Sequence, residues 1–167
     1  MKLTQYSDLG LRLLIYLALR HGKTATIQEA SDRFAVSKNH MVKISHQLTK
    51  AGLIESTRGR YGGVRLARPP ESITVEESVR ATEDNFDLVE CFSETHNHCV
   101  ITGVCKLKNV LFSARKAFFE VLQEVTLADL VKNKGSLERS LLPFPIKIKV
   151  ESITRSGQVA PKRNRQT

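Results

Sequence analysis

The chain has 167 residues, 41% of them hydrophobic, and a formal net charge of +9. This length suits one domain, or one small domain with an added element, and the hydrophobic content is enough for one core. The apolar stretch 13–19 is too short to span a bilayer and no small-residue cleavage site follows it, so the sequence argues against a membrane protein and a signal peptide, and a cytoplasmic location is expected.

The charge is distributed unevenly along the chain. Residues 1–70 carry +8 (12 basic and 4 acidic residues), residues 71–145 carry −4 (8 and 12) and residues 146–167 carry +5 (6 and 1). A basic N-terminal part favours a polyanionic partner such as nucleic acid, provided that the fold gathers these charges on one face. A solvated basic surface without a partner is the simpler alternative.

The first predicted element is an amphipathic helix. Apolar residues recur at three- and four-residue steps from Leu3 to Arg20, and Gly22 follows the end of the pattern. Asp8 and Arg12 stand one turn apart outside the apolar surface, so a surface ion pair is the expected role of both.

Two shorter helices are predicted next. A capping box at Thr26 and Glu29 opens a helix to about Phe34, and Ser37 can cap a second helix over residues 38–51. Two helices joined by a tight turn, with polar side chains at the start of the second, are typical of a helix-turn-helix. An ordinary αα-hairpin is the alternative.

A hairpin follows the two helices. Residues 53–58 and 64–67 have strand character, and the glycines between them indicate a turn. A hairpin in this position predicts the wing of a winged helix-turn-helix, with Arg58, Arg60 and Arg65 at its tip, where arginine can enter the minor groove. Charge, helix pair and wing agree, so DNA binding is the leading hypothesis.

The expected fold is mainly α-helical with a small β wing. We predict a winged helix-turn-helix domain at 1–82, a loop at 83–106, a dimerisation helix and short terminal helix at 107–135, and a flexible basic tail at 136–167, which could add non-specific attraction to DNA. The long helix carries an apolar stripe, and its expected dimer contacts are Leu111, Ala114, Phe118 and Leu122.

All three cysteines fall in the loop, at Cys91, Cys99 and Cys105, with the spacing C-x7-C-x5-C. Clustered thiols in an odd number favour a metal or iron–sulfur site over a disulfide framework. Clusters normally have four protein ligands, so the three cysteines leave the fourth ligand of a cluster unassigned. A single disulfide with a spare thiol, three inert small residues, and a zinc site completed by His96 or His98 are the alternatives.

The sequence does not predict an enzyme. It contains no Gly-rich phosphate loop, carboxylate pair or nucleophile motif. A redox enzyme that uses a cluster for electron transfer is the enzymatic alternative, and no cofactor-binding motif supports it.

Several segments together resemble a known family. MKLTQYSDLGLRLLIYLA, SKNHMVKI, RGRYGGVRL, the ECF…C…C loop and TLADLV, spread over residues 1 to about 140, are similar to the iron–sulfur winged-helix repressors of the IscR/NsrR/RirA superfamily. Asp8 and the NHMVKI segment resemble the nitric-oxide-sensing NsrR branch most. The C-x7 spacing is shared with iron-responsive relatives of the RirA type.

The resemblance implies a homodimer, crossed through the long helix, that binds inverted-repeat operators on double-stranded DNA. It implies that Cys91, Cys99 and Cys105 hold a [2Fe-2S] or [4Fe-4S] cluster, with Asp8 of the other subunit as fourth ligand and Arg12 holding Asp8 when the cluster is absent. It also implies DNA contacts at the helix-turn-helix and the wing, here Gln28, Ser37, Lys38, Asn39, His40, Lys43, Arg58, Arg60 and Arg65.

The function expected from this resemblance is a repressor that leaves its operator when nitric oxide attacks the cluster. Two alternatives stay open. The signal could be iron supply or cluster status, or the loop could be a structural zinc site in a constitutive DNA-binding module.

Overall fold

The computed structural model describes residues 2–20, 22–57, 59, 62–93 and 95–141. Within these residues the chain forms seven α-helices, two short 3-10 helices and one two-stranded sheet. In chain order they are α1 (Gln5–Leu19), α2 (Ile27–Phe34), α3 (Lys38–Lys50), β1 (Ile54–Thr57), β2 (Gly63–Leu66), η1 (Pro70–Ser72), α4 (Val75–Thr82), η2 (Glu90–Phe92), α5 (Lys106–Gln123), α6 (Leu127–Leu130) and α7 (Lys134–Leu141).

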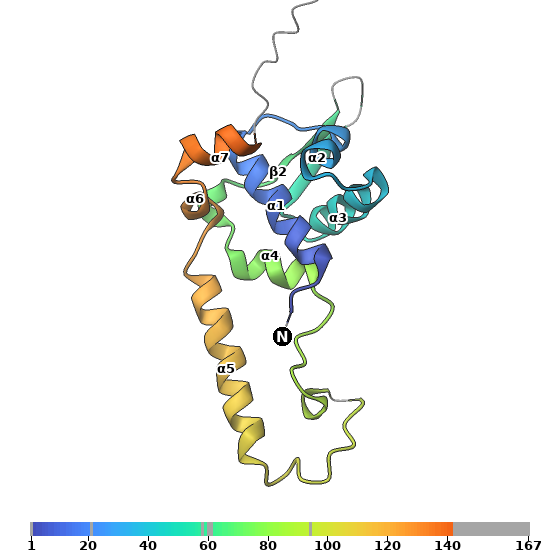
Figure 1. The fold of residues 1–167 in the computed structure, drawn as a ribbon, viewed down its shortest axis with the longest axis vertical. Coiled ribbons are helices and arrows are strands. Elements are labelled where there is room, and N and C mark those ends of the chain that lie inside the picture. Colours follow the sequence, from blue (N-terminus) through green and yellow to red (C-terminus); the bar gives the residue numbers. More distant parts are fainter. Residues whose placement is uncertain (1, 21, 58, 60–61, 94, 142–167) are drawn as a thin grey trace, which may run out of the picture.

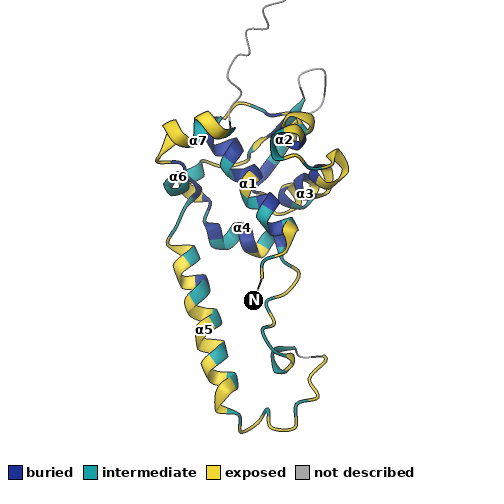
Figure 2. Cartoon of the chain, in the orientation of Figure 1, coloured by how far each residue is buried: buried dark blue, intermediate teal, exposed yellow. Residues whose placement is uncertain are grey.

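Helix α1 forms the centre of the core. Leu13, Leu14 and Leu17 are all buried, because α3, α4, β2 and α6 pack against this helix (Figures 1 and 2). Burial of each of these side chains stabilises the fold by roughly 1.5–3 kcal/mol. The helix that carries Asp8 is therefore held firmly in the core.

The helix-turn-helix forms as its capping signals predict. Thr26 and Glu29 make a complete capping box at the start of α2, and Ser37 caps α3 through its hydroxyl, which accepts a hydrogen bond from the His40 N–H at 3.2 Å. Between the helices, Ala35 adopts a left-handed conformation with a φ of 52°. The short turn fixes α3 against α2 and leaves one side of α3 exposed.

The wing is an antiparallel hairpin held to the core at its second strand. In β2, Val64 exchanges backbone hydrogen bonds of 2.8 and 2.9 Å with Ala25, just before α2. Gly63 allows this close approach, since a Cβ on Gly63 would lie 2.5 Å from the Ala25 carbonyl oxygen. The orientation of the wing is thus coupled to that of the helix-turn-helix.

Helix α5 extends away from the core, and residues 83–105 run beside it (Figure 1). Phe119 is the one buried residue that the structure describes within α5. The chain then returns to the core through backbone hydrogen bonds from Val75 to Val125 and from Leu127 to Ile73. The cysteine loop and α5 therefore form an arm attached to the core near α4.

The C-terminal part differs from the predicted organisation. Helix α7 covers residues 134–141, where the sequence predicted a flexible tail from residue 136. Leu137 and Leu141, one turn apart, pack against the core and give this segment an apolar side. The rest of the predicted tail, residues 142–167, lies outside the described residues.

None of the helices in the described part of the chain combines the length and the apolar character needed to cross a membrane.

Candidate functional site

The exposed side of α3 is the first component of the candidate site. Lys38, Asn39, His40 and Lys43 are exposed, as is Ser37 at the cap. The first turn of α3 contains no acidic residue, and the free N–H groups of a helix N-terminus attract phosphate. The predicted DNA-binding residues of this helix therefore lie together on an accessible surface.

Two further basic residues share this surface. His46 and Lys50 are exposed and follow Asn39 and Lys43 at four- and three-residue steps, which places all four on one side of the helix. Three of them, Lys43, His46 and Lys50, line an open depression beside α4 together with Val42, which is 46% exposed. Neither His46 nor Lys50 is among the predicted DNA contacts, which lie at the start of the helix, although the same periodicity points to both.

On α2, Gln28 is exposed and donates a hydrogen bond from Nε2 to Asp32 Oδ1 at 2.8 Å. Its side chain is therefore held on the outer surface of α2, near the start of the helix-turn-helix.

The position of Arg65 corrects the prediction for the wing. Arg65 lies within β2, directly opposite Glu55, and the two side chains form an ion pair. It is therefore not at the wing tip, and Glu55 partly neutralises the charge that was expected to meet DNA. Arg58 and Arg60, the other two predicted wing contacts, lie outside the described residues.

The three cysteines occupy three different local environments. Cys91 lies in η2, Cys99 lies in the irregular loop and Cys105 is the N-cap of α5; all three are half-buried and free. Among the described residues, no three His, Cys, Asp or Glu side chains lie close enough to hold a metal ion. Binding a metal through all three thiols therefore requires the loop to close around it.

Local hydrogen bonds shape the loop around Cys99. Asn97 Oδ1 accepts hydrogen bonds from the Cys99 N–H and the Thr102 hydroxyl, both at 3.1 Å. His96 and His98 are exposed, and His96 Nδ1 lies 2.7 Å from the Thr95 hydroxyl.

The start of α5 has an electrostatic environment suited to an anionic group. Cys105 has no side-chain capping hydrogen bond and the first turn contains no acidic residue, whereas Lys106 and Lys108 both lie in it. The unpaired N–H groups and the helix dipole add to these two cations. Thiolate ligands, and a thiolate-bound metal centre of net negative charge, are stabilised at such a position.

Asp8 forms the predicted surface ion pair. Arg12 binds it through two atoms, with Nη2 2.7 Å from Oδ2 and Nε 3.1 Å from Oδ1. Both side chains are about half exposed, at 49% and 52%, and such exposed pairs contribute at most about 1 kcal/mol. The Asp8 carboxylate can therefore leave Arg12 at little cost.

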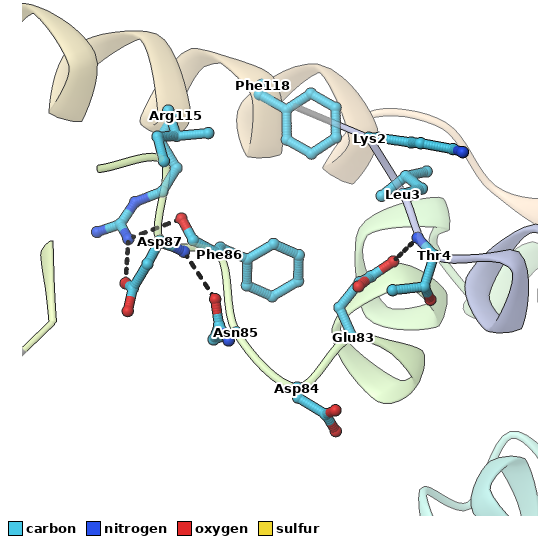
Figure 3. Close-up of a pocket in the computed structure, with 11 residues that line it drawn as sticks. Lys2, Leu3, Thr4, Glu83, Asp84, Asn85, Phe86, Asp87, Arg115 and Phe118 are labelled. Carbon is cyan, nitrogen blue, oxygen red and sulfur yellow. Dashed lines mark hydrogen bonds and ion pairs between the residues drawn. The ribbon is translucent and has the colours of Figure 1, made fainter. Parts of the chain in front are cut away.

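Glu83 connects the start of the cysteine loop to α1. Its Oε1 accepts a hydrogen bond from the Thr4 N–H at 2.7 Å, and Thr4 is the N-cap of α1 (Figure 3). Partial burial opposes ionisation of Glu83, but hydrogen bonds from Ser7 and Thr4 outweigh it and hold the pKa of this carboxyl below its usual value. The segment that leads to Cys91 is thus fixed to the helix that carries Asp8.

The family model named Rrf2, described as an iron-dependent transcriptional regulator, matches residues 3–133. The chain belongs to the Rrf2 family. It is accordingly a DNA-binding transcriptional regulator and not an enzyme.

Individual relatives within the Rrf2 family agree with this assignment. The HTH-type transcriptional regulator NsrR of Shouchella clausii is 47% identical over 145 residues, which cover 86% of this chain and 97% of that protein. Among solved structures, T. potens IscR is 28% identical with a TM-score of 0.62 and covers 80% of this chain and 88% of its own. CymR, the global cysteine regulator of B. subtilis, is 29% identical with a TM-score of 0.64 and covers 80% and 98%. The predicted winged-helix fold is confirmed.

Proposed function

We propose that this chain is an iron–sulfur-dependent repressor that senses nitric oxide and leaves its operator when the ligands of its cluster are lost. The observation that carries the proposal is the set of three free thiols on one loop, placed between a winged helix-turn-helix and a long exposed helix. The identity of 47% to a regulator named NsrR supports the same function. A regulator of chromosomal genes acts in the cytoplasm.

The donor set fits an iron–sulfur cluster. Cys91, Cys99 and Cys105 would supply three soft thiolates, and Asp8 of the partner subunit would supply a fourth, oxygen ligand. The cations at the start of α5 offset the negative charge that thiolate ligation brings. When bound, a [2Fe-2S] or [4Fe-4S] cluster supplies the iron to which nitric oxide bonds.

The chain's own residues convert ligand loss into a change of shape. The structure shows Asp8 paired with Arg12. If Asp8 were engaged as a ligand, the loop would have to close and the carboxylate would have to leave Arg12; loss of the ligands would allow the pair to form again. This changes how the arm made of α5 and the loop sits against the α1 of the partner.

A homodimer built along α5 would place two recognition helices together. Leu107, Val110 and Val121 are 61–63% exposed and, with the exposed Ala114 and Ala117, recur at alternating three- and four-residue steps, as in a two-helix seam. Of the four contacts predicted from sequence, Ala114 belongs to this stripe, and Leu111, Phe118 and Leu122 are half-buried against their own chain.

The DNA-binding step needs only a modest change in geometry. Two recognition helices must be spaced by about one turn of DNA to read both half-sites. Each 1.4 kcal/mol lost from binding lowers operator affinity about tenfold, so a small shift of the arm is enough to release the repressor.

An iron-responsive repressor is the second candidate, because the matching family model is described as iron-dependent. Treating cells with an iron chelator or with nitric oxide separates the two. If the protein senses nitric oxide, its target genes are derepressed by nitric oxide at constant iron. If it senses iron, its target genes are derepressed by the chelator alone.

Anaerobic purification followed by a visible spectrum and by iron, sulfide and zinc analysis tests the cofactor. We expect a coloured protein with iron and sulfide, and loss of both in Cys99→Ala. Val100→Ala is the matched control, because Val100 is the next residue and its side chain is 99% exposed; it should keep the cluster. A colourless parent protein with stoichiometric zinc would instead support a structural zinc site.

A further inference from the structure

We propose that Arg115 is a positioning residue of the cysteine loop, which holds Cys91 in a fixed place relative to Cys105 before any metal binds. This inference rests on the proposed function, since it assigns a role in assembling the ligand set. It concerns residues of α5 and of the segment before Cys91.

Arg115 contacts the segment 86–92 in three ways. Its Cζ lies 4.4 Å from the centre of the Phe92 ring, and its Nη1 donates a hydrogen bond to the Phe86 carbonyl oxygen at 3.3 Å. The same nitrogen lies 3.8 Å from Asp87 Oδ1, with 25% of the arginine side chain exposed (Figure 3). One guanidinium therefore binds the backbone, a carboxylate and an aromatic face of a single segment.

These contacts connect two of the three thiols through one helix. Phe92 is the neighbour of Cys91, and its ring packs edge-on against Phe112 at 6.3 Å between centroids. The Arg115 Cζ lies 5.3 Å from the centre of the Phe112 ring. Because Cys105 caps this same helix about two turns before Phe112, the positions of Cys91 and Cys105 are set by one rigid element.

A second contact anchors the beginning of the segment. Phe86 packs edge-on against Phe119 at 4.7 Å between centroids, and the Cζ of Arg80 on α4 lies 3.8 Å from the centre of the Phe119 ring. In contrast, the described hydrogen bonds around Cys99 are local to the loop. Two thiols are therefore held in place, and Cys99 closes onto them.

When two ligands are already fixed, the loop loses less conformational entropy on binding a metal. Arginine suits this role, because its planar guanidinium can stack on a ring and donate hydrogen bonds from its edge at the same time. Lysine keeps the charge and loses this geometry, so Arg115→Lys distinguishes positioning from a general effect of charge.

The test compares Arg115→Lys and Arg115→Gln with the parent and with Lys116→Gln. Lys116→Gln is the matched control, because it removes a neighbouring cation that is 71% exposed and pairs with Glu120 on the surface at 3.6 Å. We expect both Arg115 variants to release iron to a chelator about tenfold faster under anaerobic conditions, as the loss of one stacked, partly buried guanidinium predicts. Lys116→Gln should match the parent.

A second readout uses the cluster-free protein. Backbone hydrogen exchange over residues 86–92 should become faster in both Arg115 variants and in Phe92→Leu, which removes the ring face and keeps an apolar side chain. Exchange within α1 and α3 should stay unchanged, which checks that the variants are folded.

The outcomes separate this inference from the proposed function. If the parent protein carries no iron, the proposed function fails, and the exchange experiment still decides whether Arg115 fixes the segment. If the parent carries a cluster and Arg115→Lys retains both its iron and its exchange protection, the inference is wrong and the proposed function stands.

Discussion

At the residue scale, the Asp8 carboxylate has two competing partners, Arg12 and the proposed metal centre. We expect Asp8→Ala to lower the free energy of unfolding by at most about 1 kcal/mol, because the pair with Arg12 is exposed. We also expect this variant to lose iron faster than the parent, as measured by absorbance. Arg12→Ala breaks the same pair but keeps the carboxylate, so it should hold iron at least as firmly as the parent. Equal iron retention in parent and Asp8→Ala would remove Asp8 from the ligand set.

Glu83 gives a pH-dependent prediction at the same scale. Its pKa is lowered from the usual 4.5 by hydrogen bonds from Ser7 and Thr4, against the opposing effect of burial. A lowered carboxyl pKa contributes stability that is present above the unfolded value and lost as the pH falls through the folded value.

We therefore expect the parent to be more stable than Glu83→Gln at neutral pH, with a difference that narrows as the pH falls below 4.5. Urea unfolding of both proteins across this range measures it. A difference that does not change with pH would mean that the ionised carboxylate is not what links the loop to α1.

At the scale of elements, the wing depends on one close contact. Gly63→Ala would place a Cβ 2.5 Å from the Ala25 carbonyl oxygen, so the wing must move away from the helix-turn-helix. We expect a loss of about 1–3 kcal/mol in unfolding stability and weaker operator binding by fluorescence anisotropy. Gly135→Ala in α7 is the control, because the nearest atom to its Cβ would be a flexible arginine terminus at 3.9 Å, and it should bind operator as the parent does. If Gly63→Ala also binds operator as tightly as the parent, the orientation of the wing is not coupled to that of the helix-turn-helix.

The elements themselves could largely be predicted from sequence. The starts of α2 and α3 follow from local side-chain capping by Thr26 and Ser37, which needs no knowledge of the tertiary fold. Arg65 could not be placed, because strand register decides whether it lies opposite Glu55 or at the tip. The spacing on α5 likewise defines two apolar stripes, and only the tertiary contacts of α5 distinguish the half-buried stripe from the exposed one.

At the scale of the whole molecule, the proposed site draws on residues of more than one chain. The clustering of the three cysteines predicts a metal or iron–sulfur site, but among the described residues they do not form a preassembled one. A sequence identifies donor atoms by their chemistry, whereas closure of the loop depends on the metal and, as proposed, on Asp8 of a partner. The role of Arg115 was also missed, because nothing local in the sequence connects it to Phe92.

The basic C-terminal stretch gives a prediction for the complete protein. Removing residues 146–167 deletes six basic residues and one acidic residue. We expect weaker binding to non-operator DNA and a shallower dependence of log affinity on log salt concentration, since fewer counterions are released. An unchanged salt slope would show that this stretch does not meet DNA.

The central claim is that the ligand state of Cys91, Cys99, Cys105 and Asp8 sets the affinity for operator DNA. The most direct measurement is an anaerobic anisotropy titration of operator with the cluster-loaded protein, before and after nitric oxide, with Cys99→Ala measured in parallel. The account predicts a fall of at least about tenfold after nitric oxide, equivalent to 1.4 kcal/mol, and weak binding by Cys99→Ala that does not respond to nitric oxide. Equal, tight binding in all three states would contradict it.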